Sequence, residues 1–122
     1  MMAALSGQIA ERCARNFLEG YGLKHLTSNF RCRVGELDLV MLHGEILVFV
    51  EVRQRRPSRF ANAAQSVDAR KQRKLTMTAQ LFLQRHPHLR DRPCRFDVIA
   101  YDDRPEDGRP PNWLKAAFDV AG

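Results

Sequence analysis

A chain of 122 residues that is 44% hydrophobic has the size and apolar content of one compact domain, so we expect a single domain over residues 1–122. Its 20 lysines and arginines against 14 aspartates and glutamates give a net charge of +6, which favours a polyanion such as nucleic acid over an acidic protein or a neutral metabolite. The polar N-terminus, the lack of long apolar stretches and three widely spaced cysteines argue against secretion, membrane spanning and disulfides, so we expect a cytoplasmic protein without a membrane partner.

A first amphipathic helix is predicted from Ala3 to Glu19, ending at the "GYG" of residues 20–22. Its apolar residues recur at helical spacing: Leu5, Ile9, Cys13 and Phe17. Glu11 lies beside the edge of this apolar arc. Two interpretations stay open for it, because the side chain can point along the sheet or pair with Arg15 at i, i+4.

Three strands are predicted next, over 23–33, Glu36–Leu42 and Ile46–Val52, because these segments are rich in β-branched and aromatic residues. The last two read as a hairpin with His43-Gly44 as a two-residue turn. This register pairs Leu42 with Glu45 and puts Glu36 opposite Glu51.

The hairpin carries its charged residues at the end away from the turn. With side chains alternating between faces, one face receives Glu36, Asp38, Glu51 and Arg53. In the predicted register Asp38 reaches Glu51 diagonally, at about 7 to 8 Å. Carboxylates placed so close repel each other when they are desolvated, so either arginines or a divalent cation such as Mg²⁺ or Mn²⁺ must neutralise them.

The second half of the chain predicts one helix and two strands after a polar loop. Ser66 can cap a helix that continues to about Gln84, since Pro87 prevents further extension. A strand is predicted from Cys94 to Tyr101, in which Asp97 reads as a buried structural acid rather than a further ligand. The closing "NWLKAAFDV" can form a strand or a short helix, and we prefer the strand. The order α-β-β-β-α-β-β then fits one α/β domain with a mixed central sheet flanked by helices.

A basic segment runs from Arg53 to Lys74 and contains a single acid, Asp68. Beyond Arg53 its cations are Arg55, Arg56, Arg59, Arg70, Lys71, Arg73 and Lys74. Such a cluster suits the phosphate backbone of a nucleic acid, although a solvated basic face has the same composition. Phosphate contacts hold a backbone without reading its sequence.

The spacing of the hairpin acids resembles a known nuclease signature. Asp38, twelve intervening residues and then Glu51-Val52-Arg53 resemble the D…(D/E)-x-K motif of the PD-(D/E)xK superfamily. From about Ala10 to Tyr101, the stretches "AERCARNFLEGYGLKHL", "SVDARKQRKL" and "CRFDVIAY" resemble the bacterial YraN-type family. The resemblance implies a restriction-endonuclease-like fold, close to the archaeal Holliday-junction resolvases.

The resemblance also implies roles for individual residues. In such nucleases the acid matching Asp38 is the central metal ligand, Glu51 is the second ligand, and the backbone carbonyl of Val52 can complete the site. Glu11 would join the metal site or its surroundings, and we place Glu36 in a supporting role. The implied activity is Mg²⁺- or Mn²⁺-dependent hydrolysis of phosphodiester bonds in DNA, with branched or structured DNA as substrate and a homodimer as the form found in the resolvases.

One residue departs from the motif. Arg53 occupies the position of the usual lysine, and arginine does not lose a proton at working pH, so it can stabilise charge but cannot act as a base. Lys71 is the nearest alternative amine, unless it is an ordinary surface lysine. The departure supports a second hypothesis, a nucleic-acid-binding module that does not cut. A third hypothesis is a protein-interaction adaptor whose acids pair with arginines.

Overall fold

The computed structural model describes residues 2–54, 67–102 and 104–118. The element order confirms the predicted α-β-β-β-α-β-β sequence. The helices and strands are α1 (Met2–Gly20), β1 (Lys24–Arg31), β2 (Glu36–His43), β3 (Ile46–Gln54), α2 (Ala69–Arg85), β4 (Cys94–Tyr101) and β5 (Asn112–Phe118). Two short 3₁₀ turns, Pro87–Leu89 and Pro105–Asp107, precede and follow β4. None of the helices in the described ranges is long and apolar enough to cross a membrane.

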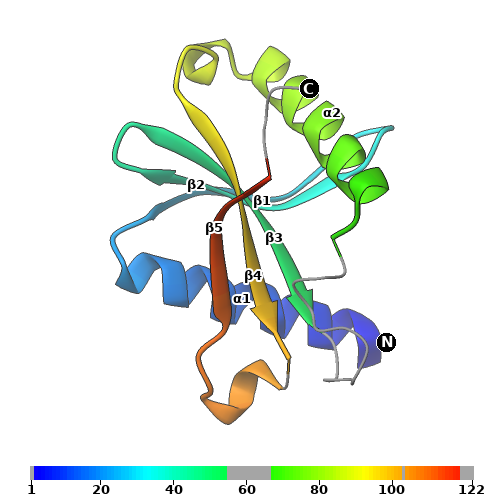
Figure 1. Ribbon diagram of the computed structural model, residues 1–122, viewed down its shortest axis with the longest axis vertical. Coiled ribbons are helices and arrows are strands. Elements are labelled where there is room, and N and C mark those ends of the chain that lie inside the picture. The colour runs from blue at the N-terminus through cyan, green and yellow to red at the C-terminus, as the bar shows by residue number, and fades with distance from the viewer. Residues whose placement is uncertain (1, 55–66, 103, 119–122) are drawn as a thin grey trace.

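The five strands form one mixed sheet in the order β1-β2-β3-β4-β5. Only the central pair, β3 and β4, is parallel, and α2 makes the connection between them. The other three pairs are antiparallel. Helix α1 lies on one side of the sheet and α2 on the other, so the sheet is the middle layer of three (Figure 1).

Each face of the sheet has its own apolar core because both faces are covered by a helix. Towards α2, Val40 and Phe49 pack with Phe82. Towards α1, Met41 and Val48 pack with Leu18. Alternate residues of β2 and β3 therefore enter different cores, as expected for strands buried on both sides.

The predicted register of the hairpin is wrong by two residues. His43 pairs with Ile46, so the turn consists of Gly44 and Glu45. Gly44 has φ of +62°, the conformation that a type II′ hairpin requires at its first turn position. Because the register moves by two positions, the side chains within the ladder keep their faces, but the ladder ends at Leu39–Val50 and does not reach the predicted Glu36–Glu51 pair.

The predicted cap of the second helix is also wrong. Asp68, not Ser66, is the N-cap of α2, and its carboxylate accepts a hydrogen bond from the Lys71 N–H at 2.9 Å. An aspartate satisfies the free N–H groups of a first turn as well as a serine does. The helix continues to Arg85, and β5 confirms the preferred strand at the end of the described chain.

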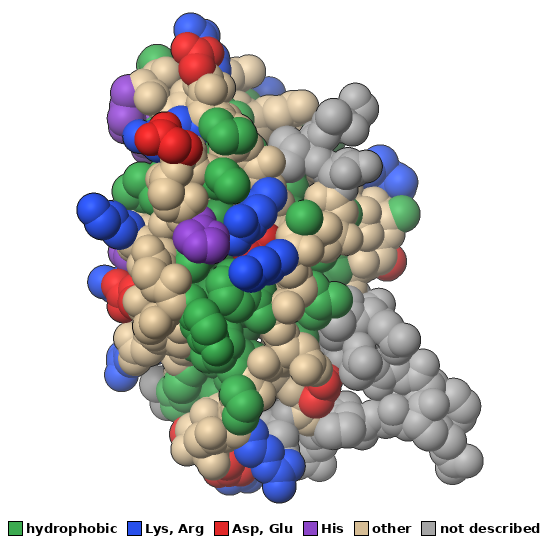
Figure 2. Space-filling model, turned by 60° about the vertical axis from the view of Figure 1, so that its left-hand side comes forward, with side chains coloured by type: hydrophobic (Ala, Val, Ile, Leu, Met, Phe, Trp, Pro, Cys, Tyr) green, Lys and Arg blue, Asp and Glu red, His purple; other side chains and the backbone are tan. Residues whose placement is uncertain are grey.

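The outer surface combines apolar and charged areas. One face shows hydrophobic side chains gathered in a continuous area, with a histidine and several Lys or Arg side chains along its border (Figure 2). Tyr21 and Leu114 are among the large hydrophobic side chains exposed on the molecule. Tyr21 packs on Trp113 with ring centroids 5.4 Å apart, so the end of α1 is attached to β5.

Candidate functional site

The site begins where β2 and β3 separate. Their ladder runs from His43–Ile46 to Leu39–Val50. Beyond the last pair of this ladder, the Asp38 carboxylate accepts a hydrogen bond from the Val52 N–H at 2.8 Å. This bond holds the Asp38 carboxylate at the fork between the two strands, while the sequence had singled out the Val52 carbonyl.

Three carboxylates meet on one side of this fork. Glu11 from α1 joins Glu36 and Asp38 from β2, with one oxygen of each within 4.8 Å of the others. Burial and the nearby charges of Asp38 and Glu36 raise the pKa of Glu11, although Asn29 and Arg31 oppose the shift. Arg15, the alternative partner predicted for Glu11, instead pairs with Glu19 on the same helix at 3.3 Å.

Glu51 also contacts Asp38 but does not belong to this three-carboxylate group, and it is almost fully buried, with 4% of its surface exposed. Burial, a hydrogen bond with Asp38 and the charge of Asp38 raise the pKa of Glu51 to about 9, against the smaller effects of Lys71 and Arg53. The metal-free Glu51 carboxyl therefore keeps a proton at neutral pH and donates it to Asp38. Its Oε2 is a buried side-chain oxygen that has no hydrogen-bond partner among the described residues.

Two cations approach that oxygen from different elements. Lys71 Nζ on α2 lies 3.4 Å from Glu51 Oε2, and the guanidinium Nη1 of Arg53 on β3 lies 3.8 Å from it. The structure therefore brings Lys71, the alternative amine suggested by the sequence, into the site. Neither contact is a hydrogen bond to Oε2. Because Glu51 keeps its proton, the two cations face the negative charge of the Asp38–Glu51 pair as a whole.

The comparisons with known proteins cover the part of the chain that contains this site. The model of "Uncharacterised protein family UPF0102" matches residues 10–101, which include every described site residue from Glu11 to Lys71. The chain belongs to the UPF0102 family. A UPF0102 protein of Pseudomonas putida (strain GB-1) is 51% identical over 93% of each chain. A second, from strain KT2440 of that species, is 50% identical over 98% of this chain and 99% of its own, and one from Pseudomonas syringae pv. syringae (strain B728a) is 52% identical over 93% of each.

The predicted nucleic-acid contacts of this UPF0102 chain divide into two groups. Arg70, Arg73 and Lys74 lie exposed in the first turns of α2, next to Lys71. The other three, Arg55, Arg56 and Arg59, lie outside the described residues.

Sequence reasoning missed a second basic element beside the acids. Arg31 ends β1 and lies 3.3 Å from Glu36, and the exposed Arg33 follows in the connection to β2. Arg31 is 74% exposed, so the ion pair is worth little for stability, and the guanidinium group remains accessible to a ligand. The two arginines flanking Cys32 were visible as "RCR", but their closeness to the acids depends on the β1–β2 register.

Asp97 takes the structural role expected for it. The carboxylate is fully buried and accepts hydrogen bonds from Arg95 Nε at 3.0 Å, from Trp113 Nε1 at 2.9 Å and from the Ala116 N–H at 3.0 Å. These bonds satisfy both oxygens, so Asp97 holds β5 against β4 and is not available as a ligand.

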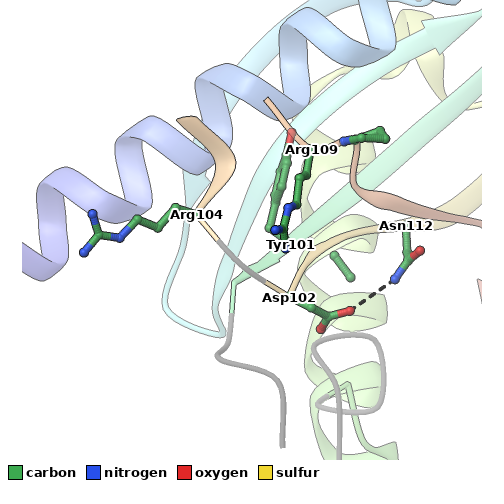
Figure 3. Close-up of a pocket in the computed structure, with 7 residues that line it drawn as sticks. Tyr101, Asp102, Arg104, Arg109 and Asn112 are labelled. Atoms are coloured by element: carbon green, nitrogen blue, oxygen red, sulfur yellow. Dashed lines mark hydrogen bonds between the residues drawn. The ribbon is translucent and has the colours of Figure 1, made fainter. Parts of the chain in front are cut away.

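A small cavity of about 140 Å³ opens at the carboxyl end of β4 (Figure 3). Asn112 donates to Asp102 at 3.2 Å on one side of it, while Arg109 lies along Tyr101 and Arg104 points away. The β3–β4 register places Arg53 beside Ala100, so this cavity neighbours the carboxyl end of β3. The acids of the fork do not line it.

The donor set at the fork fits a hard divalent cation. Carboxylate oxygens are the ligands that Mg²⁺ and Mn²⁺ prefer. Asp38 is shared between the Glu11–Glu36 group and Glu51, and the unpartnered Oε2 of Glu51 is a buried oxygen that a cation would satisfy. The arrangement can therefore bring a cation and a phosphate oxygen together next to Lys71.

Proposed function

We propose that this UPF0102 protein is a metal-dependent endonuclease of the PD-(D/E)xK type that hydrolyses phosphodiester bonds in DNA. One observation carries the proposal: Asp38, fixed by the Val52 N–H, contacts Glu51, whose buried Oε2 lacks a hydrogen-bond partner among the described residues. A buried and incompletely satisfied carboxyl group such as Glu51 costs stability, and binding of a functional ligand would explain why it is kept.

Asp38 and Glu51 would hold Mg²⁺ or Mn²⁺, with Glu11 and Glu36 beside them. When bound, such a cation lowers the pKa of water and stabilises negative charge on a phosphate. The Val52 N–H keeps the Asp38 carboxylate in one orientation, and the burial of Glu51 excludes water from its side of the fork. Arg53 and Lys71 add positive charge where the phosphate oxygens would lie.

The substrate proposed is DNA in the cytoplasm, held through its phosphates. Arg70, Arg73 and Lys74 on α2 and Arg31 and Arg33 near β2 place exposed cations on two sides of the acids. These groups can bind a backbone without reading bases. Branched or structured DNA is the substrate class suggested by the resemblance to the resolvases.

The test compares Asp38→Asn and Glu51→Gln with the wild type on branched, duplex and single-stranded DNA in Mg²⁺ or Mn²⁺. Glu45→Gln is the matched control, because Glu45 is an exposed acid in the turn of the same hairpin. We expect both site variants to lose at least about a hundredfold in cleavage while they still bind DNA. Equal cleavage by the wild type and both site variants would overturn the proposal.

A non-catalytic nucleic-acid-binding module is the second candidate. Arg53 favours it, because this position carries no amine that can exchange a proton. Wild-type protein that binds DNA in Mn²⁺ without cleaving any of the three substrates would support the module. Failure to bind at low salt would contradict both candidates.

A further inference from the structure

The buried carboxyl pair is balanced by a cation from another element of the fold. Lys71 Nζ lies 3.4 Å from Glu51 Oε2, closer than Arg53 at 3.8 Å. Since Oε2 forms no hydrogen bond with the described residues, the approach of Lys71 depends on charge and not on a directed bond. An ion pair of this kind can exchange its cation without breaking a hydrogen bond at that oxygen.

Lys71 is anchored at its backbone, and its side chain is partly exposed. Its N–H donates to the Asp68 carboxylate at 2.9 Å, which anchors the first turn of α2. Its side chain is 39% exposed and has a flexible four-carbon stem. The ammonium group can therefore turn from Glu51 towards solvent while α2 stays in place.

We propose that Lys71 is an exchangeable counter-ion of the Asp38–Glu51 pair, which yields Glu51 to a divalent cation and then contacts a phosphate of the substrate. This inference rests on the proposed function, because it needs a cation at the fork. A cation held there and an ammonium group beside Glu51 repel each other at short range. Arg70, Arg73 and Lys74 lie on the same turns of α2, so a phosphate backbone attracted to them would meet the released ammonium group.

The test measures Mn²⁺ alone, without DNA, from the electron paramagnetic resonance signal of free Mn²⁺. Lys71→Ala is compared with Lys74→Ala, which removes the same charge from an exposed position of the same helix, and with Lys71→Arg, which keeps the charge. We expect Lys71→Ala to bind Mn²⁺ about thirtyfold more tightly, the effect of one unit charge about 4 Å from a divalent cation in a water-like site. Lys74→Ala and Lys71→Arg should change the affinity less than about twofold.

A second measurement follows cleavage at saturating Mn²⁺. Lys71→Ala should lower kcat by more than it raises KM, because the released ammonium group acts on the phosphate as charge develops, and Lys71→Arg should restore part of kcat. Circular dichroism confirms the fold of each variant. Lys71→Gln, a polar side chain without charge, replaces Lys71→Ala if the latter is unfolded.

The outcomes separate this inference from the proposed function. If the wild type binds Mn²⁺ but Lys71→Ala binds it equally or more weakly, the counter-ion role is overturned and the nuclease proposal stands. If Lys71→Ala binds Mn²⁺ more tightly but the wild type cleaves no DNA, the counter-ion role is supported and the nuclease proposal fails. Wild-type protein that binds no Mn²⁺ overturns both.

Discussion

At the scale of single residues, Glu51 determines how the site responds to pH. Its carboxyl group is charged above pH 4.5 in an unfolded chain but keeps its proton up to about pH 9 in the folded one. Between these values the folded state binds more protons than the unfolded state, so the stability from this group is present below pH 4.5 and decreases as pH rises to about 9. The metal-free fork is therefore least stable under alkaline conditions.

Glu51→Gln should remove this part of the pH dependence, because glutamine resembles the protonated carboxyl group and does not titrate. Thermal unfolding of the metal-free protein in a chelator, followed from pH 5 to 9, should show a declining Tm for the wild type and a flatter profile for the variant. Glu45→Gln, at the exposed turn, should follow the wild type. Parallel profiles for wild type and Glu51→Gln would contradict the assignment of this proton to Glu51.

Gly35 directly precedes the site residue Glu36, and its lack of a side chain lets this part of the chain pack closely against Thr78 of α2. A Cβ at this position would lie 2.9 Å from Thr78 Oγ1, and Thr78 is buried and donates to the Lys74 carbonyl at 2.8 Å. Gly35→Ala should therefore destabilise the protein by about 1–3 kcal/mol in urea unfolding, as overpacking does. Adding Thr78→Ala to Gly35→Ala should recover part of the lost stability. Gly7→Ala is the control and should not lower the stability, because a Cβ at position 7 meets nothing within 4 Å.

At the scale of the elements, the sequence was sufficient for the order of helices and strands but not for their register. The apolar and β-branched runs predicted β2 and β3, and the two-residue turn was right in length. Its position was wrong, because a glycine satisfies either His43-Gly44 or Gly44-Glu45, and only the packed sheet decides between them. A shift of two residues preserves the alternation of side chains within the ladder, which ends at Leu39–Val50, one position before Asp38 and Glu51.

The contacts that sequence reasoning could not derive come from elements far apart in the chain. Lys71 was named only as the nearest amine, and its distance from Glu51 is set by the path of α2 over the sheet. The meeting of Glu11 with Asp38 likewise depends on how α1 crosses the other face. Such placements follow from packing of whole helices, which a local pattern does not encode.

The cap of α2 links an element to the site. Asp68→Ala removes the side-chain acceptor of the Lys71 N–H and should cost about 1 kcal/mol in urea unfolding, whereas Asp68→Asn keeps an acceptor and should cost much less. If the first turn of α2 frays, Lys71 moves away from Glu51, and Mn²⁺ affinity should rise towards that of Lys71→Ala. Equal stability of Asp68→Ala and the wild type would contradict the role of Asp68 as cap.

At the scale of the whole molecule, basic residues of a helix and of a strand contact the acids of the fork: Lys71 of α2 lies near Glu51, and Arg31 of β1 pairs with Glu36. The net charge of +6 alone predicts attraction to any polyanion. The structure adds where exposed cations lie: on the first turns of α2, next to Lys71, and at the end of β1, where Arg31 pairs with Glu36. A phosphate backbone bound across the fork would contact both elements at once. Its affinity would then depend on salt through each contact that neutralises a phosphate.

Replacing one cation near each end of the proposed contact, on α2 and after β1, tests whether a nucleic acid binds across the fork. Arg73→Ala and Arg33→Ala should each lower the slope of log K against log salt for duplex DNA by about 0.9, the contribution of one phosphate contact. The double variant should lose about twice as much, because the two residues lie on separate elements and act independently. Arg90→Ala, an exposed arginine after the turn that follows α2, should leave the slope unchanged. Equal slopes for wild type and double variant, measured by fluorescence anisotropy from 50 to 200 mM salt, would place the nucleic acid on another surface.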